Sequence, residues 1–208
     1  MTTEPTLSPD DGPSAPRLEA WGRYLRDAVY GATDGTVTTF AVVSGVEGAG
    51  LSPRIVLILG AANLVGDGFS MAAGNYLATK ADRQRTAAHA GQGDAGQADA
   101  DRAIPLGAAL DASPNPLTAA GVTFAAFAAA GVVPLLPYLF DATVGGNSDG
   151  TAAASSAALT AGTFFGIGAS KALVVRAHWW RAGLESLAIG GAAAALAYLC
   201  GRLLSGLA

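Results

Sequence analysis

Residues 55–78 read IVLILGAANLVGDGFSMAAGNYLA, an apolar stretch long enough to cross a lipid bilayer as one helix. The hydrocarbon core of a bilayer is about 30 Å thick and needs roughly 20 mostly apolar helical residues per crossing. The stretch also carries polar side chains, at Asn63, Asp67 and Asn75. Polar groups are costly against lipid, so a helix that keeps them needs protein or water beside them. The stretch therefore predicts a membrane-spanning helix with one polar face.

The rest of the chain has the same apolar character. Of its 208 residues, 51% are hydrophobic and only 13% are charged, which is too apolar for an ordinary soluble domain. The fold class that this predicts is all-α, an integral membrane protein with five transmembrane helices, near 28–48, 55–78, 117–140, 152–175 and 184–206. The third of these contains Pro134 and Pro137, which predict a kink or an early helix end.

Two segments lie outside these spans. Residues 1–26 contain several prolines and charged residues without an apolar core, so we expect a flexible cytoplasmic tail and not a signal peptide. Residues 27–208 then form the five-helix domain. A polar stretch over residues 80–116 predicts a short cytoplasmic loop between the second and third spans.

The basic residues test this topology, because cytoplasmic loops carry an excess of lysine and arginine. With the N-terminus in the cytoplasm, only Arg54 and Arg202 of the twelve basic residues fall on the outer side. The asymmetry favours five spans, with the N-terminus cytoplasmic and the C-terminus outside or lumenal. Four or six spans would spoil it.

Polar side chains form a stripe along the second span. Asn63, Asp67, Met71 and Asn75 follow one another at intervals of four, and residues at that spacing share one side of a helix. We expect one continuous polar track.

A matching set lies on the first span, where Asp27 and Asp34 are seven residues apart and Thr38 follows four later. The short connection at residues 52–54 predicts that these two spans are antiparallel neighbours. The two tracks are therefore expected to line one passage.

The side chains in these tracks are of the kinds that bind metal ions. Carboxylate and amide oxygens are hard ligands and the thioether of Met71 is soft, a mixture that suits Fe²⁺, Mn²⁺ or Co²⁺ better than Mg²⁺ or Ca²⁺. A carboxylate within the membrane can also take up a proton when a cation leaves. The candidate metal ligands are Asp34, Met71, Asp27, Asn63 and Asp67.

Simpler interpretations exist for several of these residues. Met71 alone is more often a packing residue, whereas an ionisable group as deep as Asp34 favours a role in transport. The alternative for Asp27, which is expected near the membrane interface, is a carboxylate that is simply solvated. The alternative for Asp67 is a neutral carboxyl group that is hydrogen-bonded within the protein. Glu47 is expected at a solvated helix end.

Other classes of function find little support. A net charge of −4 does not suggest a nucleic-acid partner. The chain has neither a phosphate-binding glycine loop nor a nucleophile beside a base, which argues against an enzyme or an ATP-driven pump. We therefore expect no catalytic residue and no cofactor, and membrane lipid as the surrounding partner.

Two segments of the chain, DAVYGATDGTVTTF over residues 27–40 and ANLVGDGFSMAAGNYL over residues 62–77, resemble the vacuolar iron transporter family. The resemblance implies five transmembrane helices, a cytoplasmic N-terminus and a homodimer. It also implies export of Fe²⁺ or Mn²⁺ from the cytosol into a vacuole or out of the cell, in exchange for protons.

The resemblance extends to single residues. Asp34 and Met71 match the family's mid-membrane aspartate and methionine, in a path between the first two helices of both subunits. Asp27 matches the acidic residue toward the cytoplasmic entrance. Asn63 stands where iron-transporting members can have a glutamate, and from its spacing Asp67 is a candidate to compensate.

One departure concerns the loop over residues 80–116, where iron-transporting members have a long helical domain rich in glutamate and methionine. The loop here contains neither residue type, so the chain resembles short members without the cytoplasmic metal-binding domain. Its preference for iron over manganese stays open, as does its membrane, a cell membrane or a vacuole-like one.

The leading hypothesis is a divalent-metal/proton antiporter for metal homeostasis. Two alternatives remain open: a membrane-embedded metal-binding or scaffold protein without transport, and a proton-coupled carrier of small organic cations. The last would use the same aspartates without needing Met71.

Overall fold

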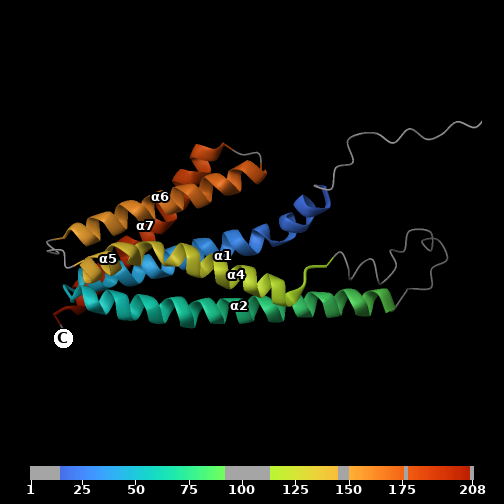
Figure 1. Ribbon diagram of the computed structural model, residues 1–208, viewed down its shortest axis with the longest axis horizontal. Helices are drawn as coiled ribbons and strands as arrows, with labels where there is room; N and C mark the ends of the chain where they lie inside the picture. The colour runs from blue at the N-terminus through green and yellow to red at the C-terminus, as the bar shows by residue number, and fades with distance from the viewer. Residues whose placement is uncertain (1–14, 92–112, 145–149, 176–177, 207–208) are drawn as a thin grey trace, which may run out of the picture.

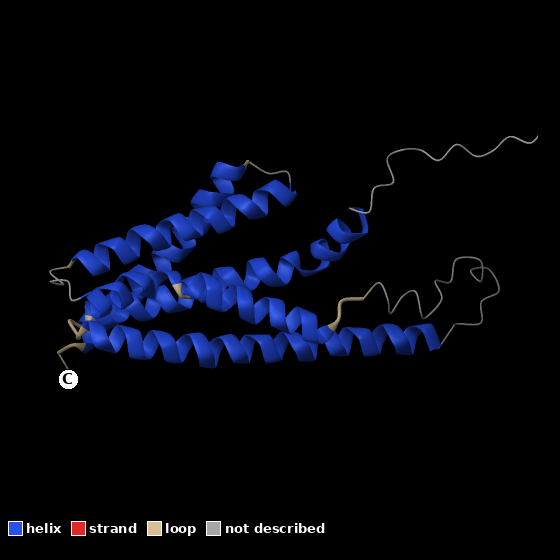
Figure 2. Cartoon of the chain, in the orientation of Figure 1, coloured by secondary structure: helices blue, strands red, loops and turns tan. Residues whose placement is uncertain are grey.

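The computed structural model describes residues 15–91, 113–144, 150–175 and 178–206. These residues form helices and no strand, as Figure 2 shows, which confirms the all-α class. The helices are α1 (Ala15–Gly48), α2 (Pro53–Gly91), α4 (Pro116–Gly131), the short 3-10 helix η2 (Val133–Leu135), α5 (Leu136–Val144), α6 (Thr151–Val175) and α7 (Trp179–Leu204).

Helix α1 occupies the centre of the bundle. It contacts α4 and α7 most extensively and also touches α2 and α6. Consecutive long helices run in opposite directions, and the C-terminal end of α7 lies at the end of the bundle where α1 gives way to α2 (Figure 1). The beginning of α1 and the end of α2 lie toward the opposite end.

Four helical segments are long and apolar enough to cross a membrane: Pro53–Ala88, Pro116–Val144, Thr151–Ala172 and Trp179–Leu204. They make this chain an integral membrane protein. The expected span near 28–48 lies in α1 and is not among them, since its acidic and polar residues lower its hydropathy. Because α1 is surrounded by other helices, those residues have protein beside them.

Helix α1 begins at Ala15, so residues 15–26, expected in the tail, are helical. Pro16 stands in the first turn, where a missing backbone N–H breaks no helical hydrogen bond. The hydroxyl oxygen of Tyr24 accepts a hydrogen bond from the backbone N–H of Asn115 at 3.0 Å. Asn115 also caps α4, so this bond joins the beginnings of α1 and α4.

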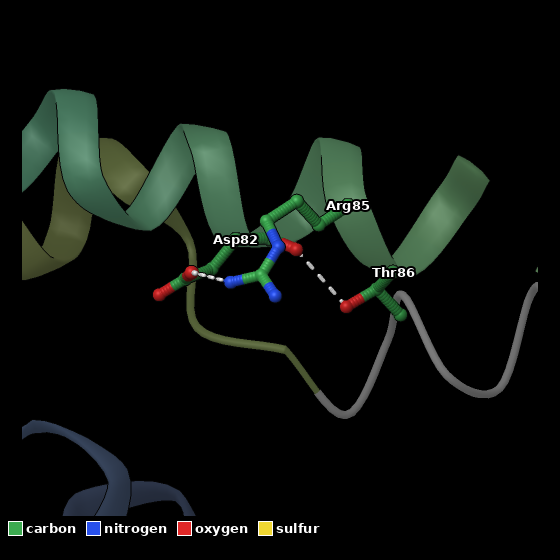
Figure 3. Close-up of polar contacts among 3 residues, drawn as sticks. All are labelled: Asp82, Arg85 and Thr86. Carbon is green, nitrogen blue, oxygen red and sulfur yellow. Dashed lines mark hydrogen bonds and ion pairs between the residues drawn. The ribbon is translucent and has the colours of Figure 1, made fainter. Parts of the chain in front are cut away.

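Helix α2 continues to Gly91, beyond the expected end of the span at residue 78. Its last turns are polar and solvated: Asp82 and Arg85 form an exposed ion pair at 3.8 Å, and the Thr86 hydroxyl donates to the Asp82 carbonyl at 3.0 Å (Figure 3). The first part of the expected loop over 80–116 is therefore helical. Residues 92–112 of that loop lie outside the described part of the chain.

The third expected span is broken where its sequence predicts. Helix α4 ends at Gly131 and α5 begins at Leu136, with Pro134 in η2 between them. Proline cannot donate a helical hydrogen bond and its ring displaces the preceding turn. The Pro134 carbonyl is satisfied by the buried hydroxyl of Ser156, which donates to it at 2.6 Å. The break is thus enclosed within protein, as irregular backbone at membrane depth requires.

Glycines bring α1 close to α4. A Cβ on Gly31 would meet the Thr123 carbonyl, and one on Gly35 would meet the Phe127 carbonyl. Small residues at a spacing of four let two helix backbones approach in lipid, and here both helices belong to one chain. Gly131 lies against Gly35 in turn, so the contact continues to the end of α4.

Candidate functional site

The five candidate ligands lie on two helices that contact each other, α1 and α2. Asp27 and Asp34 belong to α1, whereas Asn63, Asp67 and Met71 belong to α2. All five side chains are half-buried. None has the full exposure expected of a surface residue.

Asn63 bridges the two helices. Its side-chain Nδ2 donates to the hydroxyl oxygens of Thr38 and Thr39, at 3.3 Å in each case. Thr39 is fully buried, and the Thr38 hydroxyl donates in turn to the Asp34 carbonyl at 2.9 Å. The expectation that the two spans are neighbours is confirmed at this point. The amide of Asn63 therefore sits one helical turn from Asp34.

Asp34 and Asp67 form the electrostatic centre of the contact. Their carboxylates lie close enough for the two charges to interact. Among residues 15–91, 113–144, 150–175 and 178–206, no lysine or arginine forms an ion pair with either acid. Two like charges in a half-buried place repel, and a bound cation relieves that repulsion.

Met71 and Asp27 lie on the same two helices as the acid pair. Met71 follows Asp67 by one turn of α2, and Asp27 precedes Asp34 by two turns of α1. Within the part of the chain that the structure describes, no three histidine, cysteine, aspartate or glutamate side chains gather as a metal site would require. One copy therefore offers two neighbouring carboxylates, supplemented by amide and thioether groups.

The expected continuous track on α2 is wrong at its far end. Asn75 turns to α4, where its Nδ2 donates to the Thr123 hydroxyl at 2.7 Å and to the Ala119 carbonyl at 3.3 Å. At 3.6 residues per turn, each step of four advances the stripe by about 40°, so three steps carry it about 120° around the helix. Asn63 consequently faces α1, while Asn75 faces α4.

Glu47 differs from the expected solvated helix end. It is half-buried, and its Oε1 accepts a hydrogen bond from the Tyr138 hydroxyl at 2.8 Å. Tyr138 is only 2% exposed and comes from α5, beyond the proline break. No spacing rule connects residues 91 positions apart, so the sequence held no signal for this pair.

Tyr138→Phe is expected to destabilise the protein because it removes the hydrogen bond to Glu47. Bonds to charged groups contribute about 1.5–3 kcal/mol, and the loss should appear as a lower thermal unfolding midpoint in detergent. Tyr198→Phe is the matched control, since Tyr198 is substantially exposed and its hydroxyl makes no hydrogen bond to the described residues. Equal midpoints for the two variants would contradict the role given to this bond.

Comparisons with known proteins cover most of the chain. A sequence model described as the VIT family matches residues 25–102 and 100–202. "Vacuolar iron transporter homolog 1" of Oryza sativa subsp. japonica is 32% identical over 179 residues, which are 86% of this chain and 73% of that protein. "Vacuolar iron transporter homolog 2" of the same organism is 31% identical over 185 residues, 88% of this chain and 92% of that protein.

A third relative matches over a shorter segment. The "Vacuolar iron transporter" of Toxoplasma gondii is 43% identical over 60 residues, 29% of this chain and only 20% of that protein. The match therefore spans a fifth of that relative's length, whereas the matches to the two rice proteins cover 86% and 88% of this chain.

Proposed function

Because this chain belongs to the VIT family, an assignment carried by matches to most of its length, we propose that it exports Fe²⁺ or Mn²⁺ from the cytosol in exchange for protons. Its relatives are named as transporters, and the chain is not an enzyme. The observation that carries the proposal is a pair of half-buried carboxylates on two contacting helices, Asp34 of α1 and Asp67 of α2, near enough for their charges to interact.

The ligand set supports a transition metal as the cargo. Asp34 and Asp67 supply hard, negatively charged oxygens and Met71 supplies a soft sulfur. Mg²⁺ and Ca²⁺ gain little from sulfur, whereas Fe²⁺ and Mn²⁺ accept both kinds of ligand. Asn63 offers an amide oxygen on the same helix, although its Nδ2 is engaged with Thr38 and Thr39.

The carboxylate pair also supports proton exchange. Two like charges in one partly buried place are relieved either by a divalent cation or by protons. When the metal leaves toward the outer side, protons neutralise the carboxylates, and they are released to the cytosol when the next metal binds. Each exported cation is thereby coupled to inward proton movement without a further energy source.

Five spans with a cytoplasmic N-terminus are part of the proposal. Helix α1 is the first crossing, shielded from lipid by its neighbours. The alternating helix directions support this, because the beginnings of α1 and α7 and the end of α2 lie toward one end of the bundle, and the beginning of α2 and the end of α7 lie toward the other (Figure 1). In the sequence, Arg26, Lys80 and Arg181 belong to the first group of helix halves and Arg54 and Arg202 to the second. That separation is what the positive-inside rule requires.

A homodimer completes the path in this proposal. One chain brings two neighbouring acids, and a twofold axis beside α1 and α2 doubles them. Helix α2 offers a surface for such a contact: Val65 and Phe69 are exposed, and no atom lies within 4 Å of a Cβ built on Gly66 or Gly74. Small and apolar residues at this spacing suit helix association in lipid.

Proteoliposomes that contain the purified protein test the function directly. Fe²⁺, Mn²⁺, Co²⁺ and Zn²⁺ are compared with and without a pH gradient, with internal metal and pH read by fluorescent dyes. We expect metal flux accompanied by opposite proton movement, and faster flux when the gradient favours proton entry on the outer side. Metal binding without flux would identify a binding or scaffold protein and would contradict the proposal.

A further inference from the structure

Asn75 lies in a fully satisfied hydrogen-bond network between helices. Its Nδ2 donates to the Thr123 hydroxyl and the Ala119 carbonyl, and its Oδ1 accepts from the Thr79 hydroxyl at 3.4 Å. Thr123 is 1% exposed, and its own hydroxyl donates to the Ala119 carbonyl at 2.9 Å. An amide that uses both donors and its acceptor has one geometry in which all its bonds are made.

The network stands where three helices meet. The Thr123 carbonyl lies against Gly31 of α1, so closely that a Cβ there would meet it. Gly31 lies between the two acids of α1, four residues after Asp27 and three before Asp34. Asn75 lies one turn beyond Met71 on α2. The chain of contacts therefore runs from the ligand-bearing part of α2, through α4, to the ligand-bearing part of α1.

This arrangement sets the axial register of α2. Sliding α2 by one turn moves it by about 5.4 Å. The Asn75 amide would then leave Thr123 and Ala119, and an unpaired amide in an apolar surrounding is strongly unfavourable. Helices α1 and α4 cannot shift against each other in the same way, because their backbones are in contact at the glycines of α1. Asn63, which bonds to Thr38 and Thr39, holds α2 level with α1 at one end of the ligand set, and the bond from Asn75 to Thr123 holds it at the other end.

We propose that Asn75 is a positioning residue of the metal path, which acts through Thr123 to hold Met71 and Asp67 level with Asp34. The inference rests on the proposed function for its transport readout. Asn75 itself does not touch the metal, since its donors and acceptor are used within the network. Its role is to keep the ligands of α2 at the same depth in the membrane as Asp34 of α1.

The test removes the bond from the Thr123 side and then restores it. Thr123→Val keeps the shape and loses the hydroxyl, whereas Thr123→Ser keeps the hydroxyl. We expect the KM for Mn²⁺ to rise about tenfold in Thr123→Val, as for the loss of groups that orient metal ligands, with kcat changed less than about twofold. Thr123→Ser should restore the wild-type KM.

Two further measurements separate positioning from general stability. Thr163→Val is the control, because the Thr163 hydroxyl donates only to the Leu159 carbonyl of its own helix, and it should leave KM unchanged. Asn75→Ala loses the bond to Thr123 together with those to Ala119 and Thr79, so its KM should rise at least as much as in Thr123→Val. The Asn75→Ala/Thr123→Val double variant should show the same KM as Asn75→Ala, because the bond between the two residues is already lost in Asn75→Ala. Additive effects, a normal KM in Thr123→Val, or no rescue by serine would overturn the proposal.

Calorimetric binding of Mn²⁺ to the detergent-solubilised protein keeps the inference separate from the proposed function. Weaker binding in Thr123→Val, recovered in Thr123→Ser, supports positioning even if the wild type moves no metal. Unchanged binding in both variants overturns it. Wild-type protein that binds Mn²⁺ without transporting it contradicts only the transport proposal.

Discussion

Asp34→Asn is expected to abolish metal-stimulated proton movement in proteoliposomes and to lower Mn²⁺ and Fe²⁺ flux by roughly 100-fold, at the upper end of what the loss of a metal-site group costs. The substitution keeps the size of the side chain and removes its charge. Asp67 then remains as a single carboxylate. Without a second negative charge beside it, the site loses most of its preference for a divalent cation. A neutral amide at position 34 also has no proton to exchange.

Asp82→Asn is the matched control for this experiment. Asp82 makes an exposed ion pair with Arg85 on the polar end of α2, outside the apolar part of the helix (Figure 3). Exposed pairs contribute little to stability, so flux and unfolding midpoint should stay at wild-type values. Normal transport of both metals by Asp34→Asn, with the same protein folded and inserted, would show that the assigned path is wrong.

Met71→Leu is expected to change metal preference more than it changes stability. Leucine has nearly the volume of methionine, so the exchange usually costs less than about 1.5 kcal/mol. It removes the only soft ligand of the candidate set. We expect the apparent affinity for Fe²⁺ and Co²⁺ to fall about tenfold, while competition by Mg²⁺ stays as it is in the wild type.

Leu77→Met provides the comparison for Met71→Leu, since it adds a thioether to an exposed position of the same helix. It should leave the order of metal preference unchanged. A Met71→Leu variant with the wild-type order would favour a path that does not use sulfur, such as one for small organic cations. Transport of choline measured beside Fe²⁺ would then decide between these cargoes.

The helices were largely predictable because their signal is local. A bilayer demands long apolar stretches, and each stretch shows this without its neighbours, so the structure has apolar helices at Pro53–Ala88, Thr151–Ala172 and Trp179–Leu204. The break at Pro134 was predictable for the same reason. The polar ends of α1 and α2 were missed as helices, because their sequences carry no long apolar stretch.

Long-range partners were not predictable from spacing. Asn75 and Asn63 have the same residue type on one apparent stripe, yet one bonds to α4 and the other to α1. Glu47 had the pattern of a solvated helix end and is instead held by Tyr138. In each case the partner comes from a helix whose position depends on how the whole bundle is assembled.

By itself, the sequence determined that this chain is an α-helical membrane protein, since hydropathy and proline act over a single helix. It also determined which kinds of metal-binding side chain the first two helices carry, namely carboxylates such as Asp34, an amide at Asn63 and the thioether of Met71. Only the tertiary structure decided which of them meet: the charges of Asp34 and Asp67 come within range of each other, Asn63 bonds to Thr38 and Thr39, and Asn75 leaves the stripe. The reason is geometric, because the rotation and depth of each helix follow from close contacts such as Gly35 against Phe127, which spacing along one helix does not encode.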